Sequence, residues 1–237
     1  NGAYNGSDKF SVDNRFAFFN SGAIGWMISE EKFMKKLKFL DMLKIRASYG
    51  EIGNDEIGYE WDNSRRWLYM SNWGTGGNIA TGLYNTGSPY TFYREETVGN
   101  SNVHWEVVRK FNIGVDYSFF DGLIAGNLEF FKDKRTDVLI AGSERSTPSF
   151  FGGTTVVPWA NLGKVENHGY ELELRLNKVF RNGLRLWANM NMTHATNKVI
   201  ERDDAELLPE YQKQAGKVIG QTKSCLLYTS PSPRDRT

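Results

Sequence analysis

The chain has 237 residues, and its 29 Lys and Arg against 28 Asp and Glu give a formal net charge of +1. This balance gives no sign of the basic surface that nucleic-acid-binding proteins need. The mean hydropathy is −0.51. The sequence has no apolar run of about 18 residues, which excludes a transmembrane helix. Membrane barrel strands remain compatible with this low average, because they alternate apolar and polar residues.

Six β-strands are predicted in chain order, because each of these segments alternates apolar and polar side chains. A charged, amphipathic stretch after the first strand, Glu30–Asp41, predicts a short helical turn. The expected strands are Phe10–Ile28, Met42–Gly50, Trp105–Phe120, Leu123–Ile140, Val165–Phe180 and Leu184–Val199.

The alternation is clearest after Trp105, where apolar residues such as Val115 occupy odd positions and polar residues such as Asp116 occupy even ones. This strand is longer than the roughly 5–6 residues usual in globular proteins. Three apolar residues fall on a nominally polar side and break the pattern: Phe19, Met27 and Phe131.

The connections between the strands alternate in length. Asp121-Gly122 and Arg181–Gly183 are minimal hairpin turns. The segments Glu51–His104 and Ala141–Lys164, and the chain from Glu201 onward, are long and rich in Gly, Asn, Ser and Thr. Such a rhythm is typical of outer-membrane barrels, which have tight periplasmic turns and long external loops. A large soluble β-sheet protein is the alternative.

Four motifs, in order, lie between about Asn14 and Gln221. They are residues 21–31 (SGAIGWMISEE), 43–54 (LKIRASYGEIGN), 161–172 (NLGKVENHGYEL) and 216–220 (GKVIG). Together they resemble the barrel of the SusC/RagA family of TonB-dependent transporters. The resemblance implies a barrel of about 22 strands, an N-terminal plug, energisation by TonB and a surface lipoprotein of the SusD type.

The fold class expected from these features is all-β: a partial transmembrane antiparallel barrel of about six strands, forming an open curved sheet with long extracellular loops. Residues 1–224 are expected to be a fragment of that barrel, with any export signal upstream of Asn1. Residues 225–237, which contain the single Cys225, depart from the family pattern and resemble translated adapter sequence. A genuine polar loop tip is the alternative for this tail.

The resemblance implies import of oligosaccharides or peptides across the outer membrane of a Gram-negative, Bacteroidetes-like cell. The expected partners are outer-membrane lipid, a SusD-like surface lipoprotein, the TonB complex through the N-terminal part, and the substrate. No enzyme activity, catalytic residue, cofactor or nucleic-acid partner is expected. The alternative function is a soluble carbohydrate-binding or hydrolytic β-protein, which would cover Phe111, Ile113, Val115 and Leu172 with a second layer.

Two sets of residues are candidates for function. Aromatic rings of the loop Glu51–His104 could stack on sugars or peptide side chains, although they could instead pack the loop upon itself. These candidate substrate-binding residues are Trp61, Trp67, Tyr69, Trp73, Tyr84 and Tyr93. The candidate lumen-lining residues are Lys110, Asn112, Asp116, Asn127, Glu129, Glu173 and Arg175.

Histidine and tryptophan positions add little to these sets. His104, His168 and His194 match no metal-ligand spacing, so no metal site is expected. Trp26 and Trp105 share the lipid-facing parity and could belong to interfacial aromatic girdles, while Trp187 has the parity of the lumen. Burial in local packing is the alternative for each tryptophan.

Overall fold

The computed structural model describes residues 1–57, 66–79, 90–147 and 157–221. Trp61, Tyr84 and the tail 225–237 therefore lie outside the described residues. Among the described residues, no helix is long and apolar enough to cross a bilayer.

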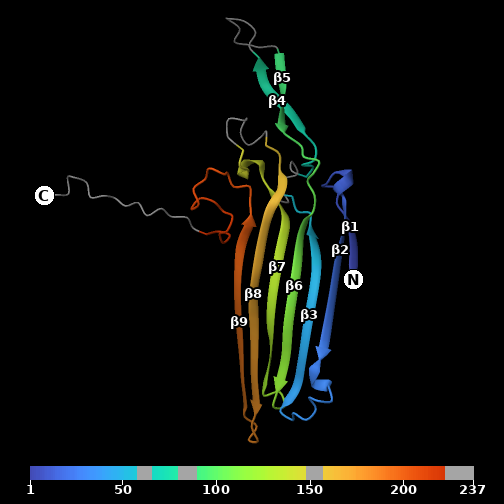
Figure 1. Cartoon of the computed structure of the whole chain (residues 1–237), viewed down its shortest axis with the longest axis vertical. Helices are drawn as coiled ribbons and strands as arrows, with labels where there is room; N and C mark the ends of the chain where they lie inside the picture. Colours follow the sequence, from blue (N-terminus) through green and yellow to red (C-terminus); the bar gives the residue numbers. More distant parts are fainter. Residues whose placement is uncertain (58–65, 80–89, 148–156, 222–237) are drawn as a thin grey trace, which may run out of the picture.

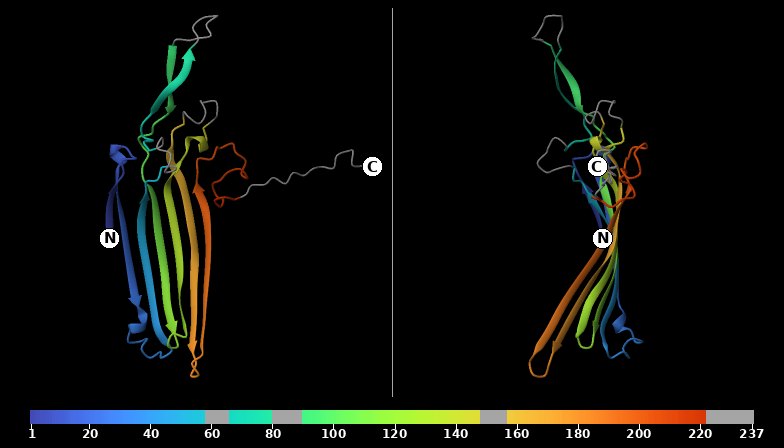
Figure 2. Two further views of the ribbon diagram at one scale, coloured as in Figure 1. Left: turned by 180° about the vertical axis from the view of Figure 1, so that it is seen from behind. Right: turned by 90° about the vertical axis from the view of Figure 1, so that its left-hand side faces the viewer.

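Seven strands form one antiparallel sheet in the order β1-β2-β3-β6-β7-β8-β9 (Figure 1). Edge-on, the sheet is a single twisted layer (Figure 2). The strands are β1 (Gly2–Gly6), β2 (Phe16–Met27), β3 (Leu40–Asn54), β6 (Glu106–Phe119), β7 (Ile124–Ile140), β8 (Ala160–Val179) and β9 (Arg185–Glu201). The six predicted strands and the open antiparallel sheet are thus confirmed, and β1 is an addition.

A second, two-stranded sheet lies within the predicted loop Glu51–His104. It is the hairpin of β4 (Asn72–Ile79) and β5 (Tyr90–Thr97), which extends beyond the ends of the long strands (Figure 1). Three short 3-10 helices complete the described elements: η1 (Val12–Asn14), η2 (Ile28–Glu30) and η4 (Gly142–Glu144).

The tight connections gather at one end of the long strands, here called the short-turn end, and the long ones at the other, the long-loop end (Figure 1). The expected helical turn after β2 appears as η2 followed by a turn in which Lys35 N–H donates to the Glu31 carbonyl (3.2 Å). The β6–β7 turn places Phe120, Asp121 and Gly122 at positive φ (57°, 54° and 76°).

The strand register gives the main sheet one apolar and one polar face. Val115 on β6 pairs with Ile45 on β3 and with Leu128 on β7. Asp116 follows Val115, and its side chain points to the opposite side because side chains alternate along a strand. The side that holds Val115 is called the apolar face, and the side that holds Asp116 the polar face.

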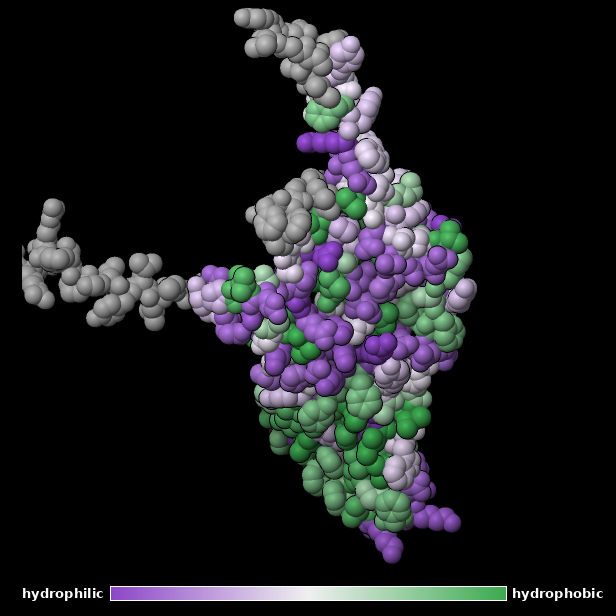
Figure 3. Space-filling view, turned by 45° about the horizontal axis from the view of Figure 1, so that its top comes forward, coloured by the Kyte–Doolittle hydropathy of each residue, from purple (hydrophilic) through white to green (hydrophobic). Residues whose placement is uncertain are grey.

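The apolar face is bare over much of its area within the described part of the chain. Large exposed side chains on it include Ile24 (78%), Trp26 (53%) and Phe130 (53%). Space-filling shows apolar residues gathered over the strands toward the short-turn end, with polar residues above them (Figure 3). The covering layer that a soluble β-protein requires is not present among the described residues.

Aromatic side chains border this apolar area at two levels. Toward the long-loop end lie Tyr49, Phe111, Phe130 and Tyr170, in two neighbouring rows of the sheet. At the short-turn end the Phe39 ring lies 6.3 Å from Phe119 and 6.0 Å from Phe120. Trp26 is also exposed there, and its indole N–H donates to Glu31 (3.0 Å).

A small buried core lies at the long-loop end, apart from the apolar face. It consists of Phe10, Phe19, Ile57, Leu68, Val103 and Trp105. Trp105 is only 8% exposed and packs against the Phe10 and Phe19 rings at 5.3 and 5.5 Å. Of the two readings for Trp105, burial in local packing is therefore confirmed and the aromatic girdle is not, because this residue precedes β6 and packs in the core.

Candidate functional site

The polar face brings all seven candidate lumen-lining residues onto one side of the sheet. Asp116 pairs with Asn127, and Asn127 pairs in turn with Glu173 on β8. The other four share this parity on their strands: Lys110, Asn112, Glu129 and Arg175. The location of these residues on one face follows directly from the alternation in the sequence.

An arginine that was not among the candidates links three strands on this face. Arg46 of β3 donates from Nη2 to Glu129 Oε2 of β7 (2.7 Å) and from Nε to Asp116 Oδ1 of β6 (3.4 Å). The Arg46 side chain passes over Gly114, where an added Cβ atom would lie 2.7 Å from Arg46 Nε. A glycine on the middle strand thus lets one guanidinium reach the second strand away.

A second polar cluster lies nearer the short-turn end. Glu173 accepts hydrogen bonds from Asn127 Nδ2 (2.9 Å) and from Arg175 Nε (2.7 Å). The Glu173 side chain is 32% exposed and that of Arg175 58%. These contacts form a solvated ionic surface on the polar face.

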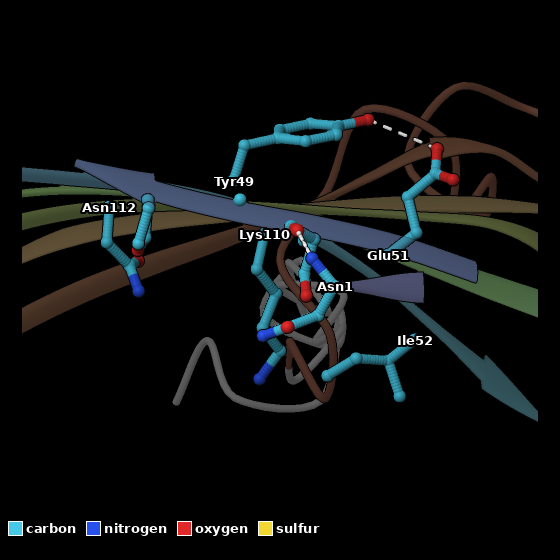
Figure 4. A pocket seen from close by; sticks show the side chains of 11 residues that line it. Asn1, Tyr49, Glu51, Ile52, Lys110 and Asn112 are labelled. Atoms are coloured by element: carbon cyan, nitrogen blue, oxygen red, sulfur yellow. Dashed lines mark hydrogen bonds between the residues drawn. The ribbon is translucent and has the colours of Figure 1, made fainter. Parts of the chain in front are cut away.

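The remaining two candidates line a hollow where β2 separates from β3. Lys110 and Asn112 share it with Ser21, Tyr49 and Asn1, and its volume is about 720 Å³. Tyr49 and Glu51 lie on one side of the ribbon, joined by a hydrogen bond of 3.1 Å, and Lys110 and Asn112 on the other (Figure 4). The residues that line the hollow therefore have side chains on both sides of the sheet, toward the long-loop end.

The described aromatic candidates fall into two separate places. Trp73 (63% exposed) and Tyr93 (68% exposed) share one face of the β4–β5 hairpin, because Tyr93 pairs with Thr75. Trp67 (48% exposed) and the half-buried Tyr69 lie in a different segment. That segment is anchored by Leu68, which is buried in the small core.

The loops after β7 and β9 are held together by a carboxylate. Asp203 accepts hydrogen bonds from Ser146 Oγ (2.7 Å), from the Ser146 backbone N–H (3.2 Å) and from Arg145 Nε (3.2 Å). Burial alone would raise the pKa of Asp203, but these donors together lower the pKa below its usual value. The carboxylate therefore stays ionised at neutral pH, and its hydrogen bonds hold the two loops together.

No group of three or more His, Cys, Asp or Glu side chains among the described residues could hold a metal ion. His104 Nδ1 lies 2.7 Å from the Asn102 carbonyl oxygen, and its backbone N–H donates to Asn161 (3.1 Å). His104 thus takes part in local loop contacts.

Replacing Arg46 by Met should lower the free energy of unfolding of the intact protein by about 1–2 kcal/mol. The loss arises because Asp116 and Glu129 would remain side by side without their shared cation. The matched control is Lys44→Met, which removes a cation from the same face that forms no salt bridge among the described residues. Equal losses in urea titrations of the two variants would show that the Arg46 contacts add no stability.

The family described as "TonB dependent receptor-like, beta-barrel" matches residues 2–222. The TonB-dependent receptor SusC of Bacteroides thetaiotaomicron is 28% identical over 219 residues, which are 91% of this chain and 20% of SusC. The TonB-dependent receptor P39 of Formosa agariphila is 31% identical over 206 residues, 85% of this chain and 17% of P39. The chain thus spans about a fifth of the length of these relatives.

Solved structures show the same fold. The RagAB peptide importer in its closed-closed state matches 91% of this chain with a TM-score of 0.70 and 22% identity, over 22% of its own chain. The open-open state matches 81% of this chain with a TM-score of 0.64 and 22% identity, over 19% of that chain.

A single-layer sheet with a bare apolar face and an ionic polar face defines the class of the protein as a wall segment of a β-barrel. The chain belongs to the TonB-dependent receptor-like β-barrel family and is of the SusC/RagA type.

Proposed function

We propose that residues 1–224 form part of the wall of an outer-membrane transporter that imports oligosaccharides or peptides with energy from TonB. The observation that supports this most strongly is the bare apolar face, bordered by aromatic rings at both ends of the strands. From Phe111 to Phe119 the strand rises about 27 Å at ~3.4 Å per residue. A tilt of about 40° reduces this to a height of ~21 Å, close to the ~25 Å apolar band of membrane barrels.

The opposite face would then line the barrel interior, where its charges stay hydrated. Arg46, Glu129 and Glu173 lie along this wall. The partners proposed for the whole transporter are outer-membrane lipid, a SusD-like lipoprotein on the cell surface, and the TonB complex acting through an N-terminal part. The cell would be a Gram-negative, Bacteroidetes-like bacterium.

Uptake by living cells tests the proposed activity. Cells that carry the intact transporter should accumulate a labelled oligosaccharide or peptide, and cells that lack TonB should not. Accumulation that is independent of TonB would contradict active import. A panel of glucans and short peptides would identify the substrate class.

The aromatic rings beyond the barrel are the proposed substrate contacts. Replacing both Trp73 and Tyr93 by Ala should raise the half-saturating substrate concentration about tenfold, because each ring contributes about 0.5–1.5 kcal/mol of stacking. Binding by the purified transporter would be measured calorimetrically. The control is Tyr211→Ala, which removes a ring of 59% exposure from the loop after β9. An equal loss in the control would mean that the hairpin has no special role.

A further inference from the structure

The apolar face changes character toward the long-loop end. Beyond Phe130 and Tyr170, the same parity of β7, β8 and β9 continues with charged side chains. Lys132 and Lys134 follow Phe130 on β7, and Lys198 lies on β9. Polar surface lies directly above the apolar area in the space-filling view (Figure 3).

These lysines surround a single carboxylate. Glu166 of β8 pairs in register with Lys134 on one side and Lys198 on the other. Its Oε1 atom binds Lys132 Nζ diagonally at 2.8 Å. Among the described residues Lys134 and Lys198 form no salt bridge, so three lysines and one carboxylate leave two positive charges uncompensated.

The neighbouring strands do not neutralise this excess. Arg109 of β6 is the direct register partner of Lys134, and like charges placed opposite each other destabilise a sheet. Arg109 Nε already binds Glu51 Oε1 at 3.0 Å, and that pair is neutral as a unit. His168, which pairs with Lys132, is exposed and faces the same side.

The position of the lysines, just above the apolar face, indicates that the phosphate of a lipid headgroup could neutralise their positive charges. Acyl tails that lie along Ile113 and Phe130 would place their headgroup at the level of Lys132, which pairs with Phe111 in the outer aromatic row, and of Lys134 in the next polar row. A lipid phosphate there would be held by its tails on the apolar face and by ammonium groups above it. Long lysine side chains near such an interface extend toward the headgroups.

We propose that Lys132, Lys134 and Lys198, which together form the basic patch, bind the phosphate of a lipid headgroup in the leaflet at the long-loop end. The inference rests on the membrane location proposed above. It adds a specific lipid contact to the barrel wall, distinct from the import path on the opposite face.

The test uses the intact transporter in detergent, titrated with diphosphorylated lipid A, with the same lipid dephosphorylated, and with inorganic phosphate. Bound lipid is counted by native mass spectrometry. The double variant Lys132→Gln/Lys134→Gln should bind diphosphorylated lipid A at least about tenfold more weakly. Binding of the dephosphorylated lipid should be unchanged, and inorganic phosphate should not compete.

The control variant Lys36→Gln/Lys38→Gln removes two exposed lysines at the short-turn end. Equal binding by the patch variant and the unmodified protein, or an equal loss in the control, would overturn the proposal. Competition by inorganic phosphate would show a simple anion site and would also overturn it. Recovery of the unmodified protein without detergent would instead refute the membrane location itself.

Discussion

Replacing Val115 by Arg in the intact protein is expected to lower its free energy of unfolding by about 2–4 kcal/mol. Val115 lies in the middle of the apolar face, between Ile45 and Leu128 on the neighbouring strands. A guanidinium there would have to leave water for hydrocarbon without a partner. The measurement is urea unfolding of the protein refolded into lipid vesicles.

Asn112→Arg is the matched control, because it places the same side chain on the same strand but on the polar face, beside the hollow. Its cost should be below about 1 kcal/mol. Asp116→Arg should also cost less than Val115→Arg, but it additionally removes the contact with Arg46 Nε. Similar losses for Val115→Arg and Asn112→Arg would argue for a packed protein layer on the apolar side.

Replacing Gly126 by Ala should destabilise the protein by about 1–3 kcal/mol, because the sheet has no space for the added methyl group. A Cβ atom on Gly126 would lie 1.9 Å from the Glu173 carbonyl oxygen, which is backbone, and 2.9 Å from the Tyr117 hydroxyl. The Tyr117 hydroxyl lies 3.3 Å from that same carbonyl of β8, across Gly126. The variant must therefore separate β7 from β8 or displace the tyrosine.

Gly22→Ala provides the control, since a Cβ atom at Gly22 would meet nothing within 4 Å. Alanine in a strand loses less conformational entropy on folding, so this variant should gain roughly 0.5 kcal/mol. Opposite signs in the same unfolding assay are expected. Tolerance of alanine at both positions would contradict the close approach of β7 and β8.

The long strands were predictable because the alternation of apolar and polar residues indicates both that a segment is a strand and which of its side chains lie on each face of the sheet. Each alternating segment of the sequence became a strand, and the parity of Val115 and Asp116 fixed the two sides. β1 was not predicted, since Gly2–Gly6 has one large side chain, Tyr4, and so presents no alternation. The hairpin of β4 and β5 was missed for a similar reason, because β4 is rich in glycine.

Two of the three exceptions to the alternation, Phe19 and Phe131, are explained by contacts between strands; nothing in the structure explains Met27. Phe19 turns into the small core and lies over Gly53, where a Cβ atom would be 2.0 Å from its ring. Phe131 likewise covers Gly169, with a corresponding distance of 2.8 Å. Such pairs cannot be read from one strand alone, because the glycine and the ring are brought together by the register.

The candidate site residues also divide into those that one strand's alternation could place and those that only the contacts between strands reveal. The parity of β6, β7 and β8 was sufficient to place Asp116, Glu129 and Glu173 on one face. Arg46 was not among the candidates, although the alternation of β3 already placed its side chain on the polar face, the opposite side of the strand from Ile45. Its contacts depend on Gly114 of the next strand, so only the three-dimensional arrangement shows them.

Accessibility of spin labels along β6 in lipid vesicles is the most direct test of what the apolar face contacts. Single cysteines from residue 107 to 119, in an intact protein without other accessible cysteines, would be labelled and measured with oxygen and with a water-soluble nickel complex. A period of two is expected, with oxygen reaching Ile113 and Val115 and nickel reaching Asn112 and Asp116. Odd positions that neither reagent reaches would reveal a protein layer over that face and contradict its contact with lipid.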